Sequence, residues 1–488
     1  MTLRKKAWSL ALYWVAMILL LSAGGWMLFE KLGDAAISDC DEARHGINAY
    51  EMLQNGESIV STYRGETDYW NLKPPLTYWC IMLGYRIFGY NALGMRAYSA
   101  LSMLLLMAVT ALWSLKRYGK VASLCTALFW LGLGAVYGPH FARFGDADAQ
   151  VALLSACAML CMLKSERDVR WLYAMAVFFG LAFLSKSWHA GLIPATCLIW
   201  LLVTGNAKRL KLRQWLLMVV FAVLPVFPWA VARYARDGFA FFKRMFTRDF
   251  FERSTQVIEG HEGDWLYYVR YLATSPAVAA AGATCLIALL ARGRRKLTLN
   301  GERWGLLLWF AVPVILYSLC VSKLEWYVFA CFAPLSILFG MACGGLARAG
   351  RGRVWRSIGL AAAVGVMAWL GSVNAIEVSQ TVNTDTYQRL MASYFDRDLY
   401  AGARCYIEYE AENDYAQVDT GTWVQDEVLC AQLVGDLDCR DGGLDAYFNE
   451  TSRAFLLIHK SSLGDWAIMD QAYMVAEEGQ LMLLQNIF

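Results

Sequence analysis

The chain has 488 residues, of which 58% are hydrophobic and 17% charged, and its formal net charge is only +3. A soluble domain carries about a quarter charged residues, so this composition excludes an ordinary soluble globular protein. The small net charge also gives no reason to expect nucleic acid as a partner.

The apolar residues come in long blocks with few charges, which is typical of membrane-spanning helices. The first block covers 8–29 and follows the basic residues Arg4, Lys5 and Lys6. It is longer than the core of a cleavable signal peptide, so we interpret it as a retained span with a cytoplasmic N-terminus. Hydropathy predicts about eleven spans in all, at 8–29, 95–115, 121–140, 149–163, 170–187, 189–204, 214–234, 272–291, 303–321, 325–347 and 354–376.

The charges in the loops agree with this topology. Every second loop, counted from a cytoplasmic N-terminus, is rich in Lys and Arg, as the positive-inside rule requires. These loops lie at 116–120, 164–170, 208–213, 292–296 and 348–356. We therefore predict a multi-pass membrane protein with a cytoplasmic N-terminus.

The chain changes character after residue 377. The last part, 378–488, is acidic and contains strand-like pieces such as Ala454–Ile458. We predict a transmembrane domain over 1–377, with long outer loops at 30–94 and 235–271, and a small extracytoplasmic α/β domain over 378–488. This last domain holds Cys405, Cys430 and Cys439, which allow one disulfide and one odd thiol without indicating the pair.

The first outer loop contains the first candidate for chemistry. Ser38 followed by an acid at position 41 is a helix-start pattern, and the helix is expected to run from Asp41 to Leu53. Asp41 and Arg44 are three residues apart and share a face. Asp41 could act as a base and Arg44 could bind an anion, but acids in the first turn of a helix also simply interact with the helix dipole.

A second helix is expected after the prolines at 74 and 75, ending near Phe88. It is too short to span and is expected to lie in the interface. Lys73 stands just before its N-terminus, where a phosphate is favoured. A lysine that only extends along the membrane surface would give the same pattern.

A third set of candidates stands where the chain enters its fourth span, with Arg143, Asp146 and Asp148. Charged residues at the membrane edge are functional candidates, although an ion pair between Arg143 and Asp146 would also explain two of them. The sequence has no Walker loop, dinucleotide fingerprint, HExxH motif or zinc-spaced CxxC pair, which argues against a nucleotide-driven pump or a nucleotide-sugar enzyme.

Four motifs occur in an order that resembles a known family. They are Asp-Glu-Ala-Arg at 41–44, Lys-Pro-Pro-Leu-x-Tyr-Trp at 73–79, Arg-x-x-x-x-Asp at 143–148 and Ser-Lys-Leu-x-x-Tyr at 322–327. From about residue 8 to 345 the chain resembles the polyprenyl-phosphate-dependent glycosyltransferases of the GT-C fold. It is most similar to the bacterial branch that includes the aminoarabinose lipid A transferase and relatives of the protein mannosyltransferases. This resemblance implies a protein of the bacterial cytoplasmic (inner) membrane.

The resemblance implies roles for particular residues. Asp41 matches the general base, and Asp148 matches a second catalytic acidic position. The residues that match groups holding the donor phosphate are Arg44, Lys73 and Arg253. Those expected to line the cavity are Glu42, Arg143, Asp146, His261, Lys323 and Tyr327.

Part of the family binds a divalent metal, and here this chain departs from the pattern. Many members have Glu where this chain has Leu72, and some have His at the position of Asp249. Asp146, His261 or Glu262 are alternative ligands, so we assign no metal site from the sequence.

The expected function is that of an inverting glycosyltransferase acting on the extracytoplasmic face. It would move a sugar from a polyprenyl-phosphate donor to a lipid A-like lipid, a cell-envelope glycan or a protein. The alternatives are a transporter or flippase of lipid-linked sugars, for which we see no inverted repeats, and an inactive binding relative. The sequence does not indicate the sugar, the acceptor or the oligomeric state.

Overall fold

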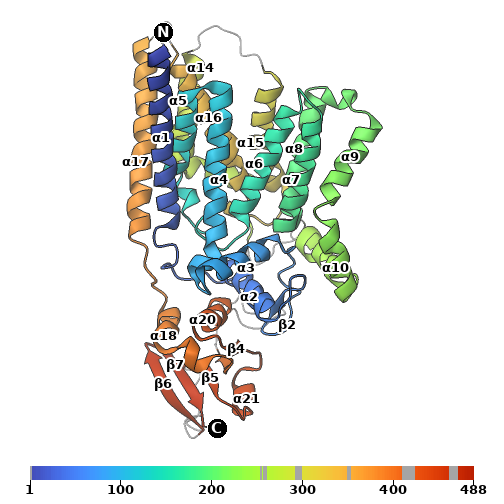
Figure 1. Ribbon diagram of the computed structural model, residues 1–488, viewed down its shortest axis with the longest axis vertical. Helices are drawn as coiled ribbons and strands as arrows, with labels where there is room; N and C mark the ends of the chain where they lie inside the picture. Colours follow the sequence, from blue (N-terminus) through green and yellow to red (C-terminus); the bar gives the residue numbers. More distant parts are fainter. Residues whose placement is uncertain are drawn as a thin grey trace.

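A computed structural model describes residues 3–252, 255, 261–291, 299–348, 353–408, 424–460 and 471–487. Long helices stand side by side in a bundle, and a small domain with a sheet lies at one end of it (Figure 1). The principal bundle helices are α1 (Leu3–Phe29), α4 (Ala92–Tyr118), α5 (Lys120–Gly132), α6 (Asp148–Lys164), α7 (Arg170–Lys186), α8 (Leu192–Val203), α9 (Leu212–Val223), α14 (Pro276–Leu290), α15 (Gly301–Leu319), α16 (Phe332–Leu346) and α17 (Arg353–Ser379).

The bundle has the surface of a membrane protein. Large apolar side chains are exposed on its outer helices, among them Leu12 and Ile18 on α1 and Trp369 on α17. Among the described residues, six segments are long and apolar enough to cross a membrane, or up to eight if each of two bent pairs forms one span. The prediction of a multi-pass helical membrane protein is confirmed, whereas the number of eleven spans stays a prediction.

Two of the expected spans are bent helix pairs rather than single helices. α9 and α10 (Phe227–Asp237) meet at 55°, and α13 (Tyr267–Thr274) meets α14 at 87°. Pro225 and Pro276 stand at the two breaks. A proline lacks the backbone N–H and its ring clashes with the preceding turn, so the helix cannot continue straight.

The span expected at 121–140 is also shorter in the structure. α5 ends at Gly132, and a short turn η1 (Gly134–Val136) follows. Gly132, Gly134 and Gly138 give this stretch little helical preference. The chain therefore leaves the bundle early and forms the loop that carries His140 and Asp146.

The first outer segment folds at the end of the bundle that faces the sheet domain. It contains α2 (Asp41–Gln54), the short hairpin β1 (Thr62–Tyr63) and β2 (Glu66–Thr67), and α3 (Leu76–Phe88), so both expected helices are confirmed. Ser38 does not cap α2 with its side chain, because Cys40, at φ 63°, is the residue that precedes the helix. Instead the backbone N–H of Ser38 donates to the Glu42 carboxylate at 2.8 Å.

The C-terminal domain has a five-stranded mixed sheet in the order β4-β3-β5-β7-β6. β3 pairs in parallel with β4 and β5, and β7 is antiparallel to β5 and β6. The strands are β3 (Arg404–Glu408), β4 (Asp438–Cys439), β5 (Ala454–His459), β6 (Ala472–Glu478) and β7 (Leu481–Asn486). The helices are α18 (Thr386–Tyr394), α19 (Arg397–Tyr400), α20 (Gln425–Gly435) and α21 (Gly443–Phe448). Cys405, Cys430 and Cys439 are buried free thiols, so the disulfide that the sequence allows is not formed in the structure.

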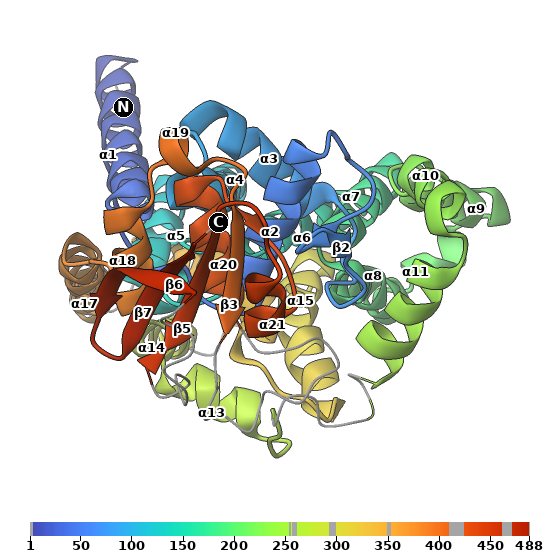
Figure 2. The same ribbon diagram turned by 90° about the horizontal axis from the view of Figure 1, so that it is seen from below.

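α20 joins this domain to the first outer segment. It lies between the sheet and α2 when the molecule is seen from the domain end (Figure 2). Leu429 of α20 packs on Gly46 of α2 so closely that a Cβ at Gly46 would lie 2.4 Å from it. Gln432 donates to Glu51 at 3.0 Å. The C-terminal domain therefore packs directly against the helix that carries Asp41.

This junction contains carboxyl groups that disfavour each other's charge. Glu427 is buried in the first turn of α20. Burial raises its pKa well above the usual value, and the nearby charges of Asp426 and Asp39 raise that pKa further. A carboxyl whose pKa is raised on folding favours the folded state fully below its unfolded value, about 4.5. That contribution is lost as the pH rises through the folded value.

We therefore expect Glu427→Gln to stabilise the protein, and more so at about pH 7.5 than at about pH 5. Thermal unfolding of the detergent-purified chain at both pH values measures this difference. Glu477→Gln is the matched control, because Glu477 is exposed on a strand and pairs with Lys460 at the surface. If the difference in unfolding temperature between Glu427→Gln and wild type were the same at both pH values, the prediction would be contradicted.

Candidate active site

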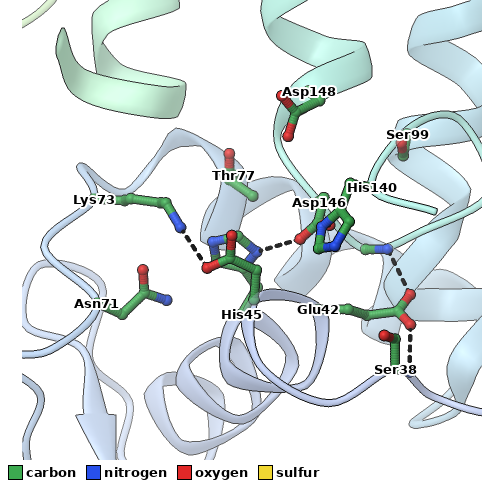
Figure 3. Close-up of polar contacts among 12 residues, drawn as sticks. Ser38, Glu42, His45, Asn71, Lys73, Thr77, Ser99, His140, Asp146 and Asp148 are labelled. Carbon is green, nitrogen blue, oxygen red and sulfur yellow. Dashed lines mark hydrogen bonds and ion pairs between the residues drawn. The ribbon is translucent and has the colours of Figure 1, made fainter. Parts of the chain in front are cut away.

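The centre of the site is an ion pair between two parts of the first outer segment. Asp41 is the first residue of α2, and Lys73 lies in the loop before α3. The Lys73 ammonium donates to Asp41 Oδ1 at 3.0 Å (Figure 3). The Asp41 side chain is 25% exposed and the Lys73 side chain is 13% exposed, so both can be reached from outside.

Asp41 and Lys73 open into a small cavity of about 30 Å³. Its other lining residues are Trp70, Asn71, Leu72, Lys186, His189, Asp249, Leu324, Trp326 and Tyr327. An adjoining cavity of about 20 Å³ shares four of these residues and adds Asp148. Such volumes hold about one or two waters. A larger substrate can therefore enter only if the surrounding loops move apart.

A second acid–base pair lines the adjoining cavity. Asp148 begins α6, and the ammonium of Lys186, the last residue of α7, donates to it. Both side chains are more than 90% buried. A buried lysine keeps its charge when a carboxylate is in contact with it, so this pair brings a second cation close to Asp41.

Two histidines meet a third carboxylate behind Asp41. His140 Nδ1 lies 2.7 Å from one oxygen of Asp146, and His45 Nδ1 lies 3.3 Å from the other. Burial alone would raise the pKa of Asp146, but the two histidines outweigh it and lower that pKa. Burial would likewise raise the pKa of Asp41, but Lys73 and His45 hold it well below the usual value. Both carboxylates are therefore ionised at neutral pH.

This cluster is also the candidate metal site among the described residues. Asp41, His140 and Asp146 each offer a ligand atom, and these atoms lie within 4.8 Å of one another. His45 Nε2 is buried without a hydrogen-bond partner, so one further nitrogen ligand atom lies beside this cluster. Nitrogen and oxygen donors of this kind suit a divalent transition metal. Leu72, by contrast, is apolar and cannot be a ligand.

A buried ion pair beside Asp41 fixes the backbone of the site. Glu42 receives two hydrogen bonds from the guanidinium of Arg96 on α4, at 2.7 and 2.8 Å. It also accepts from the backbone N–H groups of Ser38 and Gly145, at 2.8 and 2.7 Å. Glu42 thus links α2 and α4 to the loop that leads to Asp146.

Arg44 makes a different contact from the one the sequence indicates. Its guanidinium donates to both oxygens of Asp68, at 2.8 and 3.0 Å, and lies 3.3 Å over the ring of Tyr63. Asp68 in turn accepts from the backbone N–H groups of Trp70 and Asn71. Arg44 therefore holds the loop that ends at Lys73, and its assignment to the donor phosphate stays a prediction.

The other predicted residues fall into two groups. Asp41, Lys73, Asp148 and Tyr327 line the two cavities, and Asp146 lies directly behind them. The other group lies elsewhere in the structure or outside the described residues. Glu42 and Arg44 make the contacts given above, and Arg143 and Lys323 donate to backbone carbonyls at the ends of α1 and α15. His261 is exposed and outside both linings, and Arg253 lies outside the described residues.

Several residues of the site were missed or left unassigned by the sequence analysis. His45 and His140 contact Asp146, and Asp68 fixes the Lys73 loop. Lys186 and Trp326 line both cavities. A lone His or Asp in a loop gives no local signal, because its role depends on a partner far away in the sequence.

Solved structures share this fold. The chain matches ArnT from Cupriavidus metallidurans bound to undecaprenyl phosphate with a TM-score of 0.71 and 18% identity, covering 96% of this chain and 98% of that one. It also matches the oligosaccharyltransferase AglB from Archaeoglobus fulgidus, with a TM-score of 0.57, 12% identity and coverage of 96% and 70%. The fold is therefore that of the GT-C membrane glycosyltransferases.

The sequence comparisons point to one branch of this class. The profile of the dolichyl-phosphate-mannose-protein mannosyltransferase family matches residues 72–231. An undecaprenyl phosphate-alpha-4-amino-4-deoxy-L-arabinose arabinosyl transferase of Pseudomonas savastanoi pv. phaseolicola is 25% identical over 434 residues, which cover 87% of this chain and 77% of the relative. A second transferase of that name, from Pseudomonas fluorescens, is 27% identical over 67% of this chain and 56% of its own length. The resemblance seen in the sequence is thus confirmed, and the chain is a glycosyltransferase of the GT-C fold similar to the aminoarabinose transferases.

We expect Glu42→Gln to destabilise the protein by about 3–5 kcal/mol, because it leaves the buried charge of Arg96 without its partner. Thermal or denaturant unfolding of the purified chain measures the loss. Glu57→Gln is the control, since Glu57 pairs with Arg236 at the surface, where such a pair contributes at most about 1 kcal/mol. If both variants lost the same free energy of unfolding, the buried Glu42 pair would contribute no more to stability than the surface pair of Glu57.

Proposed function

We propose that the chain transfers a sugar from a polyprenyl-phosphate donor to an acceptor hydroxyl, with inversion at the anomeric carbon. The observation that carries this proposal is the ion pair of Asp41 and Lys73, which opens into a polar cavity at the edge of the bundle. The names of the relatives and the undecaprenyl phosphate bound to the ArnT structure support a lipid-linked donor.

The two lysines of the cavity match the charge of such a donor. As the bond between the anomeric carbon and the phosphate oxygen breaks, negative charge grows on the phosphate. Lys73 and Lys186 both line the cavity and would stabilise that charge. Asp148 keeps the ammonium of Lys186 in place. The polyprenyl phosphate then leaves as a stabilised anion.

Asp41 is the group placed to activate the acceptor. Its carboxylate is ionised and can take the proton of the acceptor hydroxyl while the oxygen attacks the anomeric carbon. In the resting structure Lys73 lowers the basicity of Asp41. When Lys73 turns to the donor phosphate, Asp41 loses that partner and its pKa rises. A single displacement of this kind needs no covalent glycosyl-enzyme.

The remaining predicted residues support the site in other ways. We propose Arg44 as a positioning residue that acts through Asp68 on the Lys73 loop. Arg253 stays proposed as a further phosphate ligand. A divalent ion, where one binds, would be held by Asp41, His140 and Asp146 and would add positive charge beside the leaving phosphate.

The acceptor and the side of the membrane belong to the same proposal. The basic loops at 116–120, 164–170 and 208–213 lie at the end of the bundle away from Asp41. By the positive-inside rule that end would be cytoplasmic, which supports a location of the site and the C-terminal domain outside the cytoplasm. There the acceptor would be a lipid A-like lipid, a cell-envelope glycan or a protein.

We expect Asp41→Asn to lower turnover by about a hundredfold or more, because the amide cannot take the acceptor proton. The reconstituted chain is incubated with short-chain polyprenyl-phosphate sugars and lipid, glycan or peptide acceptors, and mass spectrometry follows polyprenyl phosphate and glycosylated product. Asp34→Asn, at an exposed position of the same loop, should keep wild-type turnover. Unchanged turnover in Asp41→Asn would remove Asp41 from the mechanism. Movement of labelled donor across liposomes without transfer would favour a transporter.

Lys73→Gln tests the phosphate-binding role separately. We expect kcat to fall by about a hundredfold, as for the loss of one group that stabilises transition-state charge, and KM for the donor to rise. Lys73→Arg keeps the charge and should recover part of kcat. The variants are compared in the same mass-spectrometric assay. If kcat were as low in Lys73→Arg as in Lys73→Gln, the positive charge of Lys73 would not be the property that the reaction requires.

A further inference from the structure

A second, larger hollow lies at the other end of the bundle from Asp41. It has a volume of about 600 Å³, within the range of about 300–1,000 Å³ that is usual for small-molecule sites. Its lining comes from α4, α6 and α7, which stand next to one another in the bundle (Figure 1). Lys164 at its edge lies sixteen residues after Asp148 on α6, which is about 24 Å along the helix.

The edge of this groove is basic. Lys116 and Arg117 come from the end of α4, Lys164 comes from the end of α6, and Arg167 comes from the loop that follows. Its twelve lining residues include no acid. Glu302 of α15 contacts Arg117 at 3.3 Å from outside the lining and offsets one of the four charges. The groove therefore keeps a positive edge that suits an anionic group.

The body of the groove is apolar. It is formed by Val109 and Leu112 of α4, Leu160 of α6 and Phe178 of α7, with Cys157 and Cys161 between them. Leu112 is 41% exposed on the outer surface of the bundle. That surface faces the bilayer, so the natural occupant of the body is a hydrocarbon chain rather than water.

Two tryptophans mark the level at which the apolar body gives way to the basic edge. The ammonium of Lys164 lies 4.0 Å from the ring centre of Trp171, and the guanidinium of Arg117 lies 5.1 Å from that of Trp113. Tryptophan is enriched at the headgroup level of membranes, and basic pockets between spanning helices on the cytoplasmic side bind anionic headgroups. Trp113, Trp171 and the four basic residues therefore belong at the depth of the phosphates.

We propose that this groove binds one anionic glycerophospholipid, with its phosphate at Lys116, Lys164 and Arg167 and an acyl chain along Leu112, Leu160 and Phe178. The site is separate from the proposed donor site, because the donor phosphate belongs with Lys73 at the opposite end of the bundle. The inference does not depend on the transferase reaction.

Native mass spectrometry of the detergent-purified full chain tests the proposal, with dioleoyl phosphatidylglycerol compared with dioleoyl phosphatidylcholine. We expect the phosphatidylglycerol adduct to predominate in wild type. Removal of each charge should weaken it about fivefold, since a basic residue near an anionic surface contributes about 1 kcal/mol. The test variant is Lys116→Gln with Lys164→Gln. Lys208→Gln, an exposed lysine in another basic loop and outside the groove lining, is the matched control.

Three outcomes would overturn the proposal. They are equal binding of the two lipids to wild type, the same loss in Lys208→Gln as in the double variant, and displacement of phosphatidylglycerol by undecaprenyl phosphate. The last would assign the groove to the donor lipid. Size-exclusion chromatography shows whether each variant is folded. If the double variant is not folded, the single variant Lys116→Gln, at an exposed position, is compared with wild type and Lys208→Gln in the same way.

Discussion

The ion pair of Glu42 and Arg96 is the constraint on which the site depends. Each side chain is 1% exposed, and burying two charges costs several kcal/mol per ion unless nearly every polar atom is bonded. Glu42 accepts four hydrogen bonds. Arg96 donates its remaining hydrogens to backbone carbonyls of the segment just before α2. The pair thus joins α2, α4 and the loop before Asp146 through buried charges, beside the hydrogen bond from Tyr98 to the backbone carbonyl of Gly145. Asp41 is the next residue along, so its position is fixed by its neighbour.

The C-terminal domain supports the same helix from the other side. α20 packs against α2 at Gly46, and Gln388 of α18 bonds both to the backbone of Ile37 and to Asp426. The segment that carries Asp41 is therefore held between the bundle and the sheet domain. Loosening α20 from α2 would shift the start of α2 and with it Asp41, the proposed base, which gives this domain a part in the geometry of the site.

The sequence predicted the elements of the site better than the contacts of its side chains. α2 and α3 were predicted because signals from proline, glycine and an acidic first turn are local, although the predicted cap of α2 by Ser38 is absent. The strand β5 was predicted from its run of apolar residues. The bends at Pro225 and Pro276 were not predicted, because hydropathy averages over a break. The assignment of Arg44 to the donor phosphate stays a prediction, and its contact with Asp68, 24 residues further along the chain, was not predicted. No local pattern indicates such a partner, and the same holds for the contact between His45 and Asp146.

In the proposed mechanism, the resting pair of Asp41 and Lys73 would impose an order on the reaction. While Lys73 contacts it, Asp41 is a weak base, and the cavity has room only for water. A donor phosphate would compete with Asp41 for Lys73, and its entry would also push apart the loops around the cavity. Binding the donor would therefore both open the site and strengthen the base. An acceptor that arrived first would meet a carboxylate still held by its lysine. The geometry thus favours donor before acceptor and protects the resting enzyme from activating water.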